Sequence, residues 1–136
     1  MKYMLMMNVP KTAYESFGAW PKDALKAHIA WQLNFDKTLR ASGVLLSAEG
    51  LASPQEAKIV RAGKNGEPIL DADFPDKREF LAGYWIVEVE NAEQAYALAA
   101  KASSAPGPNG APLNMPIEVR EVPSGPPKEW LPEEIR

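Results

Sequence analysis

The sequence contains no cysteine and a single histidine, His28, among its 136 residues. Without cysteine the chain has no disulfide, no thiolate nucleophile and no thiolate ligand for zinc or an iron–sulfur cluster. One histidine without other clustered donors also argues against a transition-metal site. Acid–base chemistry near neutral pH, where this chain performs any, is therefore expected from His28 and from carboxylates.

Long hydrophobic runs are absent as well. No apolar stretch approaches the roughly 20 residues that span a bilayer. The opening segment, residues 1–10, is apolar over too short a stretch for a signal peptide with a cleavage site. Together with the lack of cysteine, which fits a reducing compartment, this predicts a cytoplasmic protein that does not bind a membrane.

Strong charge of either sign is missing, since the formal net charge is −3. Such a balance gives no field that would hold a nucleic-acid backbone. The chain also lacks a phosphate-binding glycine loop and a nucleophile elbow with a Ser-His-Asp order. We therefore expect neither nucleotide-dependent catalysis nor nucleic-acid binding, and no cofactor.

What the chain does contain is the pattern of one mixed α+β domain over residues 1–122, followed by a proline-rich tail, 123–136. Apolar runs predict strands, and one stripe at i, i+3/i+4 spacing predicts a long helix after Pro21. Residues 10–20 are expected to be irregular. The predicted strands cover residues 2–9, 43–51, 84–90 and 116–122, and the predicted helices cover residues 22–42 and 92–102.

The long helix carries the widest apolar pattern in the chain. Ala24, Ala27, His28, Trp31, Phe35 and Leu39 form its central stripe. We expect Leu25, Ile29 and Leu33 to broaden this face. The stripe predicts that His28 faces the sheet.

Local signals define a hairpin and a second helix. Asn65-Gly66 is typical of a tight turn, so residues 57–70 predict a β-hairpin that is inserted into the main sheet and has a projecting tip. Asn91 is a good N-cap, and Gln94 stands where its side chain can reach back to the start of the helix.

The element order, β-α-β-(hairpin)-β-α-β, is the ferredoxin-like arrangement of an antiparallel sheet with helices on one face. The other face of such a sheet stays open. When its residues are apolar another surface has to cover it, and a second copy of the chain is the commonest cover. We therefore expect a homodimer.

The stretch "DADFPDKREFLAGYW", residues 71–85, resembles the signature of the YCII-related family in its DGPF branch. "KYMLMM", "ASGVLLSAEGLASP", "AKIVR", "NAEQAYALAAKAS" and "IEVREV" resemble further family segments in the same order, over residues 2–122. Ala72 and Asp73 replace the glycine and proline of the signature, which changes the turn chemistry there.

This resemblance implies a dimeric α/β barrel that binds a small organic ligand. Related barrels include muconolactone isomerase-like enzymes and small monooxygenases, which use a cavity between helix and sheet. Two hypotheses follow for this chain. It is either a cofactor-free acid/base enzyme of the isomerase or lactone type, or a non-catalytic ligand-sensing or protein-interaction module linked to bacterial transcriptional regulation.

Each candidate site residue has a functional and a structural interpretation. Some YCII-like members carry a His and Asp pair proposed as catalytic, so the resemblance favours His28 as the acid/base, with Asp71 or Asp73 as its partner. The alternative for His28 is a histidine at the core edge that bonds a backbone carbonyl. The alternative for the carboxylates is a solvated loop, in which Asp71 caps backbone N–H groups.

Aromatic and cationic candidates complete the predicted site. Trp31 and Tyr84 either line the pocket or take part in core and dimer packing. Arg61 either holds a carboxylate substrate or forms an ion pair on its strand. Trp130, in the tail, either packs on the dimer partner or closes over the ligand.

Overall fold

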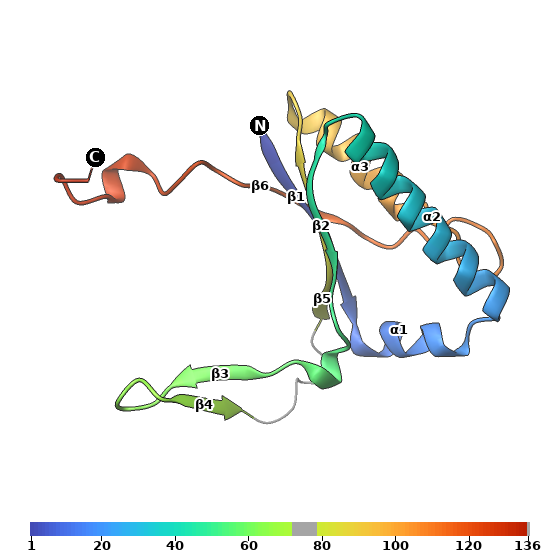
Figure 1. The fold of residues 1–136 in the computed structure, drawn as a ribbon, viewed down its shortest axis with the longest axis horizontal. Helices are drawn as coiled ribbons and strands as arrows, with labels where there is room; N and C mark the ends of the chain where they lie inside the picture. The colour runs from blue at the N-terminus through green and yellow to red at the C-terminus, as the bar shows by residue number, and fades with distance from the viewer. Residues whose placement is uncertain (72–78, 136) are drawn as a thin grey trace.

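The computed structural model describes residues 1–71 and 79–135 and confirms the α+β fold with a ferredoxin-like architecture. Its main sheet has four antiparallel strands in the order β2-β5-β1-β6. Helices α2 and α3 cover one face of this sheet (Figure 1). The bounds are β1 Lys2–Pro10, α2 Lys22–Ala41, β2 Leu45–Gly50, β5 Glu79–Glu88, α3 Ala92–Ser103 and β6 Glu118–Glu121.

The core lies between this sheet and the two helices. Leu5 in β1 and Val87 in β5 are fully buried, and their strand neighbours alternate in exposure as a pleated strand requires. On β5, Trp85 and Val87 are buried, and so is Val89 just after the strand. Helix α3 contributes small side chains, which lets it pack closely on the sheet: Ala95, Ala99 and Ala102.

Helix α2 follows the predicted stripe only in part. His28, Phe35 and Leu39 are buried as expected. The predicted broadening of the apolar face is wrong, because Leu33 is 65% exposed and Ile29 is 47% exposed. A helix that packs on a single sheet buries a stripe little wider than about 100°, and Leu33 lies about 140° around the axis from His28.

The segment predicted as irregular contains a short helix, α1 (Lys11–Ser16), and a 3-10 turn, η1 (Phe17–Ala19). Six residues are too few to give a readable periodicity or to be stable alone. Packing explains the helix instead: the ring of Tyr14 lies edge-on to Phe80 at 5.5 Å between centroids.

The predicted hairpin is present as β3 (Ile59–Ala62) and β4 (Pro68–Asp71), with Gly66 at a φ of +82° in its turn. Its expected insertion into the main sheet is wrong. Among the described residues β3 and β4 pair only with each other, in a two-stranded sheet of their own. Figure 1 shows this hairpin projecting from the side of the main sheet opposite the helices. It follows the 3-10 turn η2 (Pro54–Glu56).

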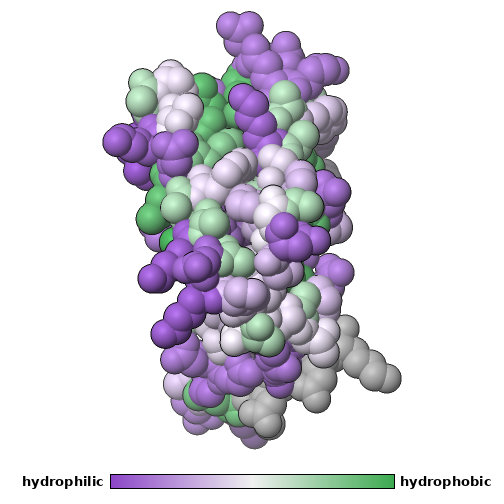
Figure 2. All heavy atoms as spheres, turned by 90° about the vertical axis from the view of Figure 1, so that its right-hand side faces the viewer, coloured by the Kyte–Doolittle hydropathy of each residue, from purple (hydrophilic) through white to green (hydrophobic). Residues whose placement is uncertain are grey.

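The tail after β6 projects on that same side and carries the 3-10 turn η3 (Lys128–Trp130) (Figure 1). Two projecting arms therefore flank the open face of the sheet. The opposite, helical side bears hydrophilic side chains over much of its extent, as Figure 2 shows. Within the described part of the chain, no helix has the length and apolar character to cross a membrane.

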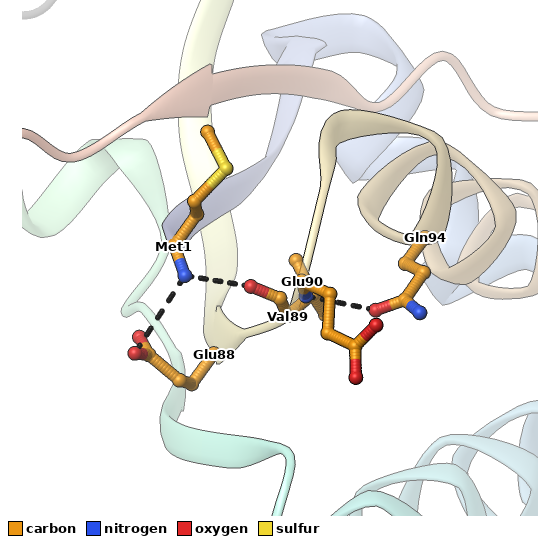
Figure 3. A network of polar contacts seen from close by, with 5 residues as sticks. All are labelled: Met1, Glu88, Val89, Glu90 and Gln94. Atoms are coloured by element: carbon orange, nitrogen blue, oxygen red, sulfur yellow. Dashed lines mark hydrogen bonds and ion pairs between the residues drawn. The ribbon is translucent and has the colours of Figure 1, made fainter.

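The start of α3 has the predicted cap. Asn91 Oδ1 accepts a hydrogen bond from the backbone N–H of Gln94 at 2.9 Å. Gln94 Oε1 in turn accepts one from the backbone N–H of Glu90, also at 2.9 Å (Figure 3). The backbone ammonium of Met1 donates to the carbonyl of Val89 at 2.6 Å, which connects the beginning of β1 to this same turn.

Candidate functional site

A cavity of about 310 Å³ lies where α1, α2 and the lower end of the sheet meet. This volume is at the lower end of the range for small-molecule sites, about 300–1,000 Å³. The wall is largely apolar and contains three side chains with hydrogen-bonding groups. The lining residues are Met7, Val9, Tyr14, Phe17, Leu25, His28, Ile29, Gln32, Gly50, Ala82 and Met115.

His28 is the most buried polar side chain of this wall, with 4% of its surface exposed. Its Nδ1 lies 2.9 Å from the carbonyl oxygen of Pro106. Phe17 and Trp20 pack on the ring with centroid distances of 5.5 and 5.4 Å, the indole edge-on. The ring is thus held on one side by a hydrogen bond and on another by two aromatic side chains.

The hydrogen bond to Pro106 fixes the proton on the His28 ring. A carbonyl oxygen only accepts, so Nδ1 carries the proton and Nε2 of the neutral ring carries the lone pair. No buried side-chain nitrogen or oxygen lacks a hydrogen-bond partner within the described residues, and Nε2 has none there. His28 is among the residues that line the cavity, and Nε2 is its ring nitrogen without a partner in the described part of the chain.

A smaller chamber of about 90 Å³ lies next to this cavity along α2. Both chambers are lined by Met7, Gln32 and Gly50. Glu49 borders the second chamber, but it is exposed and lies opposite Tyr84 in the strand register, so its carboxylate points to the other face of the sheet. The second chamber adds one carboxylate, that of Asp36. It also includes Ala48, Gly83, Tyr84 and Trp85.

Asp36 is held in the smaller chamber by the central strand. The indole N–H of Trp85 donates to Asp36 Oδ1 at 2.6 Å. This bond occupies one carboxylate oxygen and leaves acceptor capacity on the other. Helix α2 thus presents three polar groups along one line, His28, Gln32 and Asp36, each one helical turn from the next.

Sequence reasoning missed Gln32 and Asp36. The signal that would have found them is their i+4 and i+8 spacing from His28, which places all three on one side of a helix. Both residues lie beside the apolar stripe. The family resemblance pointed instead to the carboxylates of residues 71–85 as partners of His28.

The predicted carboxylate partners of His28 are placed only in part. Asp71 is the last residue of β4, where its backbone lies opposite Ile59 in the projecting hairpin. Asp73 falls in 72–78, outside the described residues. Among the residues that are described, no carboxylate hydrogen-bonds or ion-pairs with His28; the bond it makes is to the carbonyl of Pro106.

The remaining predicted residues are spread over different parts of the fold. Tyr84 lines the smaller chamber. Trp31 stacks on Phe35 at 5.2 Å between centroids and is packed against the core; it lines neither chamber. Arg61 is exposed on β3, opposite Ile69, and also lines neither.

A larger hollow, of about 500 Å³, lies beside the end of β1 and the segment before β6. Its polar side chains include Asn8, Glu79 and Glu118, and Asn8 Nδ2 donates to Glu118 Oε1 at 3.0 Å. None of its lining side chains is a buried titratable group. Chemistry therefore favours the smaller cavity that contains His28. In the described part of the chain, no cluster of three or more His, Asp or Glu side chains could hold a metal ion.

Comparison with known proteins agrees with this architecture. The family model of the YCII-related domain matches residues 1–107. This span runs from β1 through α3 and includes His28, Gln32 and Asp36, together with the carbonyl of Pro106. A search of curated proteins gives no match. Because the matched span is well over half of the chain, the protein belongs to the YCII-related domain family.

Proposed function

We propose that this protein is a cofactor-free acid/base enzyme that moves a proton on a small organic molecule, in a reaction of the isomerase or lactone type. One observation carries the proposal. His28 is buried, its Nδ1–H is bonded to the carbonyl of Pro106, and its ring, with Nε2 unpaired among the described residues, lines a cavity of small-molecule size. A general base has to meet its proton at hydrogen-bond distance, and Nε2 is the atom available for this.

The surroundings of His28 suit a ring that gains and returns a proton. When Nε2 accepts a proton, the positive charge spreads to Nδ1, where the Pro106 carbonyl dipole stabilises it. The π faces and edges of Phe17 and Trp20 exclude water and keep the ring in one orientation. A carboxylate from the signature, Asp71 or Asp73, remains our proposed orienting group for the substrate or the ring.

The alternative function is ligand sensing or protein interaction without catalysis, linked to bacterial transcriptional regulation. It is favoured by the same hydrogen bond, because a histidine that bonds a backbone carbonyl also serves a purely structural role. The two functions differ at Nε2. A catalyst exchanges the Nε2 proton with its substrate, whereas a sensor needs only the shape and polarity of the cavity.

A titration of the His28 ring by ¹⁵N NMR separates these functions. In the enzyme, the ring titrates, its pKa shifts in Asp71→Asn, and small molecules that enter the cavity move the Nε2 resonance. Asp76→Asn serves as the matched control, because it removes another carboxylate five positions along the sequence. A ring that stays neutral at every pH, or that ignores both substitutions and every ligand, overturns the catalytic proposal and favours the sensor.

We also propose that the protein is a homodimer that pairs through the open face of its sheet. Alternation places Met4 and Met6 of β1 on this face, opposite Ile86 and Tyr84 of β5 in the strand register. These four side chains are half-buried in the single chain and form an apolar centre. The two projecting arms stand on this same side (Figure 1).

Both arms present apolar side chains that their own domain does not bury. Val60, Ile69 and Leu70 on the hairpin are 55%, 49% and 57% exposed, and Trp130 in the tail is 74% exposed. A second copy on the open face would meet both arms at once, so one contact covers three exposed apolar areas. We further propose the DGPF branch and a cytoplasmic location, on the sequence patterns given above.

Sedimentation equilibrium tests the dimer. The wild type is expected at twice the 14.9 kDa of the chain. Ile86→Lys places a charge in the centre of the open face and should give monomers. Leu33→Lys is the matched control, since it makes the same kind of change on the exposed side of α2 and should leave the dimer intact. A wild type that sediments as a monomer, or equal behaviour of the two variants, contradicts the proposal.

A further inference from the structure

The two chambers are neighbours beside α2, and we treat them as one groove with a polar line along the helix wall. They share Met7, Gln32 and Gly50, so a ligand that fills the larger chamber meets the smaller one at Gln32. Along the helix axis, Gln32 lies about 6 Å from His28, and Asp36 about 12 Å from it, at 1.5 Å per residue. A compact ligand thus contacts His28 and Gln32, and a longer one also reaches Asp36.

The polar atoms that this groove offers are mostly acceptors. His28 Nε2 is an acceptor because Nδ1 holds the proton. Asp36 keeps acceptor capacity beyond its bond from Trp85. Gln32, for which no hydrogen bond occurs within the described residues, supplies an amide oxygen as well as an N–H donor.

Cations are missing from both walls. No lysine or arginine is among the described side chains that line either chamber. An anionic ligand would have to leave water for a wall that offers the Asp36 carboxylate and no compensating positive charge, which is strongly unfavourable. The predicted role of Arg61 as the holder of a substrate carboxylate has no support here, because Arg61 lies on the hairpin and lines neither chamber.

We propose that the groove binds an uncharged, largely apolar molecule with two hydrogen-bond donors, and that Gln32 is the residue that determines this specificity. The first donor bonds His28 Nε2 in the larger chamber. The second donor, about one helical turn further along, bonds the Gln32 side-chain oxygen. This inference names the substrate class of the proposed function and rests on it for its choice of cavity.

The buried state of His28 gives the groove its selectivity. The His28 ring is 96% buried, so its Nε2 lone pair cannot accept a hydrogen bond from bulk water when an apolar ligand fills the cavity. A ligand that lacks a donor at this point therefore leaves a buried acceptor unpaired. The same argument applies at Gln32. A ligand without the second donor leaves the Gln32 side-chain oxygen unpaired and therefore binds more weakly.

The experiment measures binding rather than turnover, with three related probes. 4-Hydroxybenzyl alcohol carries two donors, 4-methylphenol carries one, and 4-hydroxybenzoate carries an anionic group in place of the alcohol. Dissociation constants come from the NMR shifts of the His28 ring and the Gln32 side-chain amide. Probe concentrations extend to about 10 mM, since molecules of this size bind in the millimolar range.

We expect the diol to bind about tenfold more tightly than the benzoate. Gln32→Met, which keeps the length of the side chain and removes its amide, should weaken the diol about fivefold and leave 4-methylphenol unchanged. Asn34→Met is the matched control, because Asn34 is exposed on α2 and lines neither chamber. It should change neither affinity.

Three outcomes overturn the inference. The benzoate binds as tightly as the diol, Gln32→Met weakens both neutral probes equally, or no probe moves either resonance. None of these readouts requires proton transfer to occur. If His28 fails to titrate or to exchange its proton while the probes keep the expected order, the catalytic proposal fails and the binding inference stands.

Discussion

At Gly83, strands β5 and β2 approach each other closely beside the groove. A Cβ atom at this position would lie 2.9 Å from the carbonyl oxygen of Glu49 and 3.5 Å from the Cα of Gly50, both main-chain atoms of β2. Real side chains almost never come so near to a backbone oxygen, and backbone in a paired strand has little freedom to withdraw. The pairing of β2 with β5 therefore depends on the absence of a side chain here.

Gly83→Ala is expected to destabilise the fold by about 1–3 kcal/mol, because β2 has to separate from β5 to admit the methyl group. Urea unfolding followed by circular dichroism measures the loss. Gly50→Ala is the control, since an added Cβ there meets nothing within 4 Å. If the two variants unfold at the same urea concentration, the close contact has no energetic consequence.

Tyr3 gives the fold a pH dependence. Burial raises the pKa of the Tyr3 phenol above its ordinary value of 10.0, and Glu121, Tyr96 and Glu93 raise it further. The folded chain then binds this proton more tightly than the unfolded chain does. The stability that the neutral phenol contributes is thus fully present below about pH 10 and is lost as pH rises from there through the folded-state pKa.

Tyr3→Phe should remove this part of the alkaline loss. We expect the urea midpoint of the wild type to fall more steeply above about pH 10 than that of the variant. The comparison is made relative to each protein's own midpoint at neutral pH, which cancels the effect of deleting the hydroxyl. Parallel declines of the two proteins would show that the phenol does not contribute.

Site residues were predictable to the extent that they depend on helical periodicity. The stripe on the long helix correctly placed His28 toward the sheet, since burial follows spacing. Its hydrogen-bond partner was beyond sequence reasoning, because every residue has a backbone carbonyl and Pro106 lies 78 positions away. Gln32 was predictable from its i+4 spacing, yet its amide gave no chemical reason to select it.

At the scale of elements, α3 depends on the pair of side chains at its N-terminus. Asn91 accepts a hydrogen bond from the backbone N–H of Gln94, and the Gln94 side chain accepts one from the backbone N–H of Glu90. Figure 3 shows the second of these bonds. Helix α3 buries only alanines on its inner side, so its packing contributes less hydrophobic area than that of α2. The cap should therefore be a large part of its stability.

Asn91→Ala is expected to cost about 1 kcal/mol of unfolding free energy, since it leaves one N-terminal N–H without its acceptor. Chemical denaturation measures the change. Asn91→Asp keeps an oxygen acceptor at the same place and adds a negative charge near the positive end of the helix, so it should retain or exceed wild-type stability. A loss as large in the aspartate variant as in the alanine variant would contradict the capping argument.

Elements with a period or a cap were predicted, and elements formed by tertiary contact were not. The strands, both long helices and the Asn65-Gly66 turn follow local rules that are visible in the sequence. Helix α1 depends on the contact between Tyr14 and Phe80, which the sequence does not reveal. The hairpin was predicted as a pair of strands. Its separation from the main sheet depends on the direction in which the chain leaves that sheet, which local sequence patterns do not specify.

At the scale of the whole molecule, the layers divide the protein into two different sides. The helical side bears many hydrophilic residues (Figure 2). The groove lies between its helix α2 and the sheet. The open side has an apolar centre and two arms (Figure 1). A dimer on the open side would leave the helix layer uncovered, so the proposed association and the proposed ligand binding would use opposite sides of the sheet.

Removal of the tail, residues 123–136, tests this division. The tail follows β6 and carries Trp130, which is 74% exposed in the single chain. If the tail packs on the partner, its removal weakens the dimer, by about tenfold or more in dissociation constant when one large aromatic anchor is lost. Sedimentation equilibrium over a range of protein concentrations measures this constant.

The same truncated protein should keep the groove and its affinity for the neutral probes, because no residue of the tail lines either chamber. Trp130→Ala in the full chain is the smaller, matched change and should give most of the loss, since a buried tryptophan commonly dominates an interface. A dimer of unchanged strength in both variants would mean that the tail belongs to its own domain. Loss of probe binding in the dilute, monomeric protein would mean instead that the partner copy helps to form the groove.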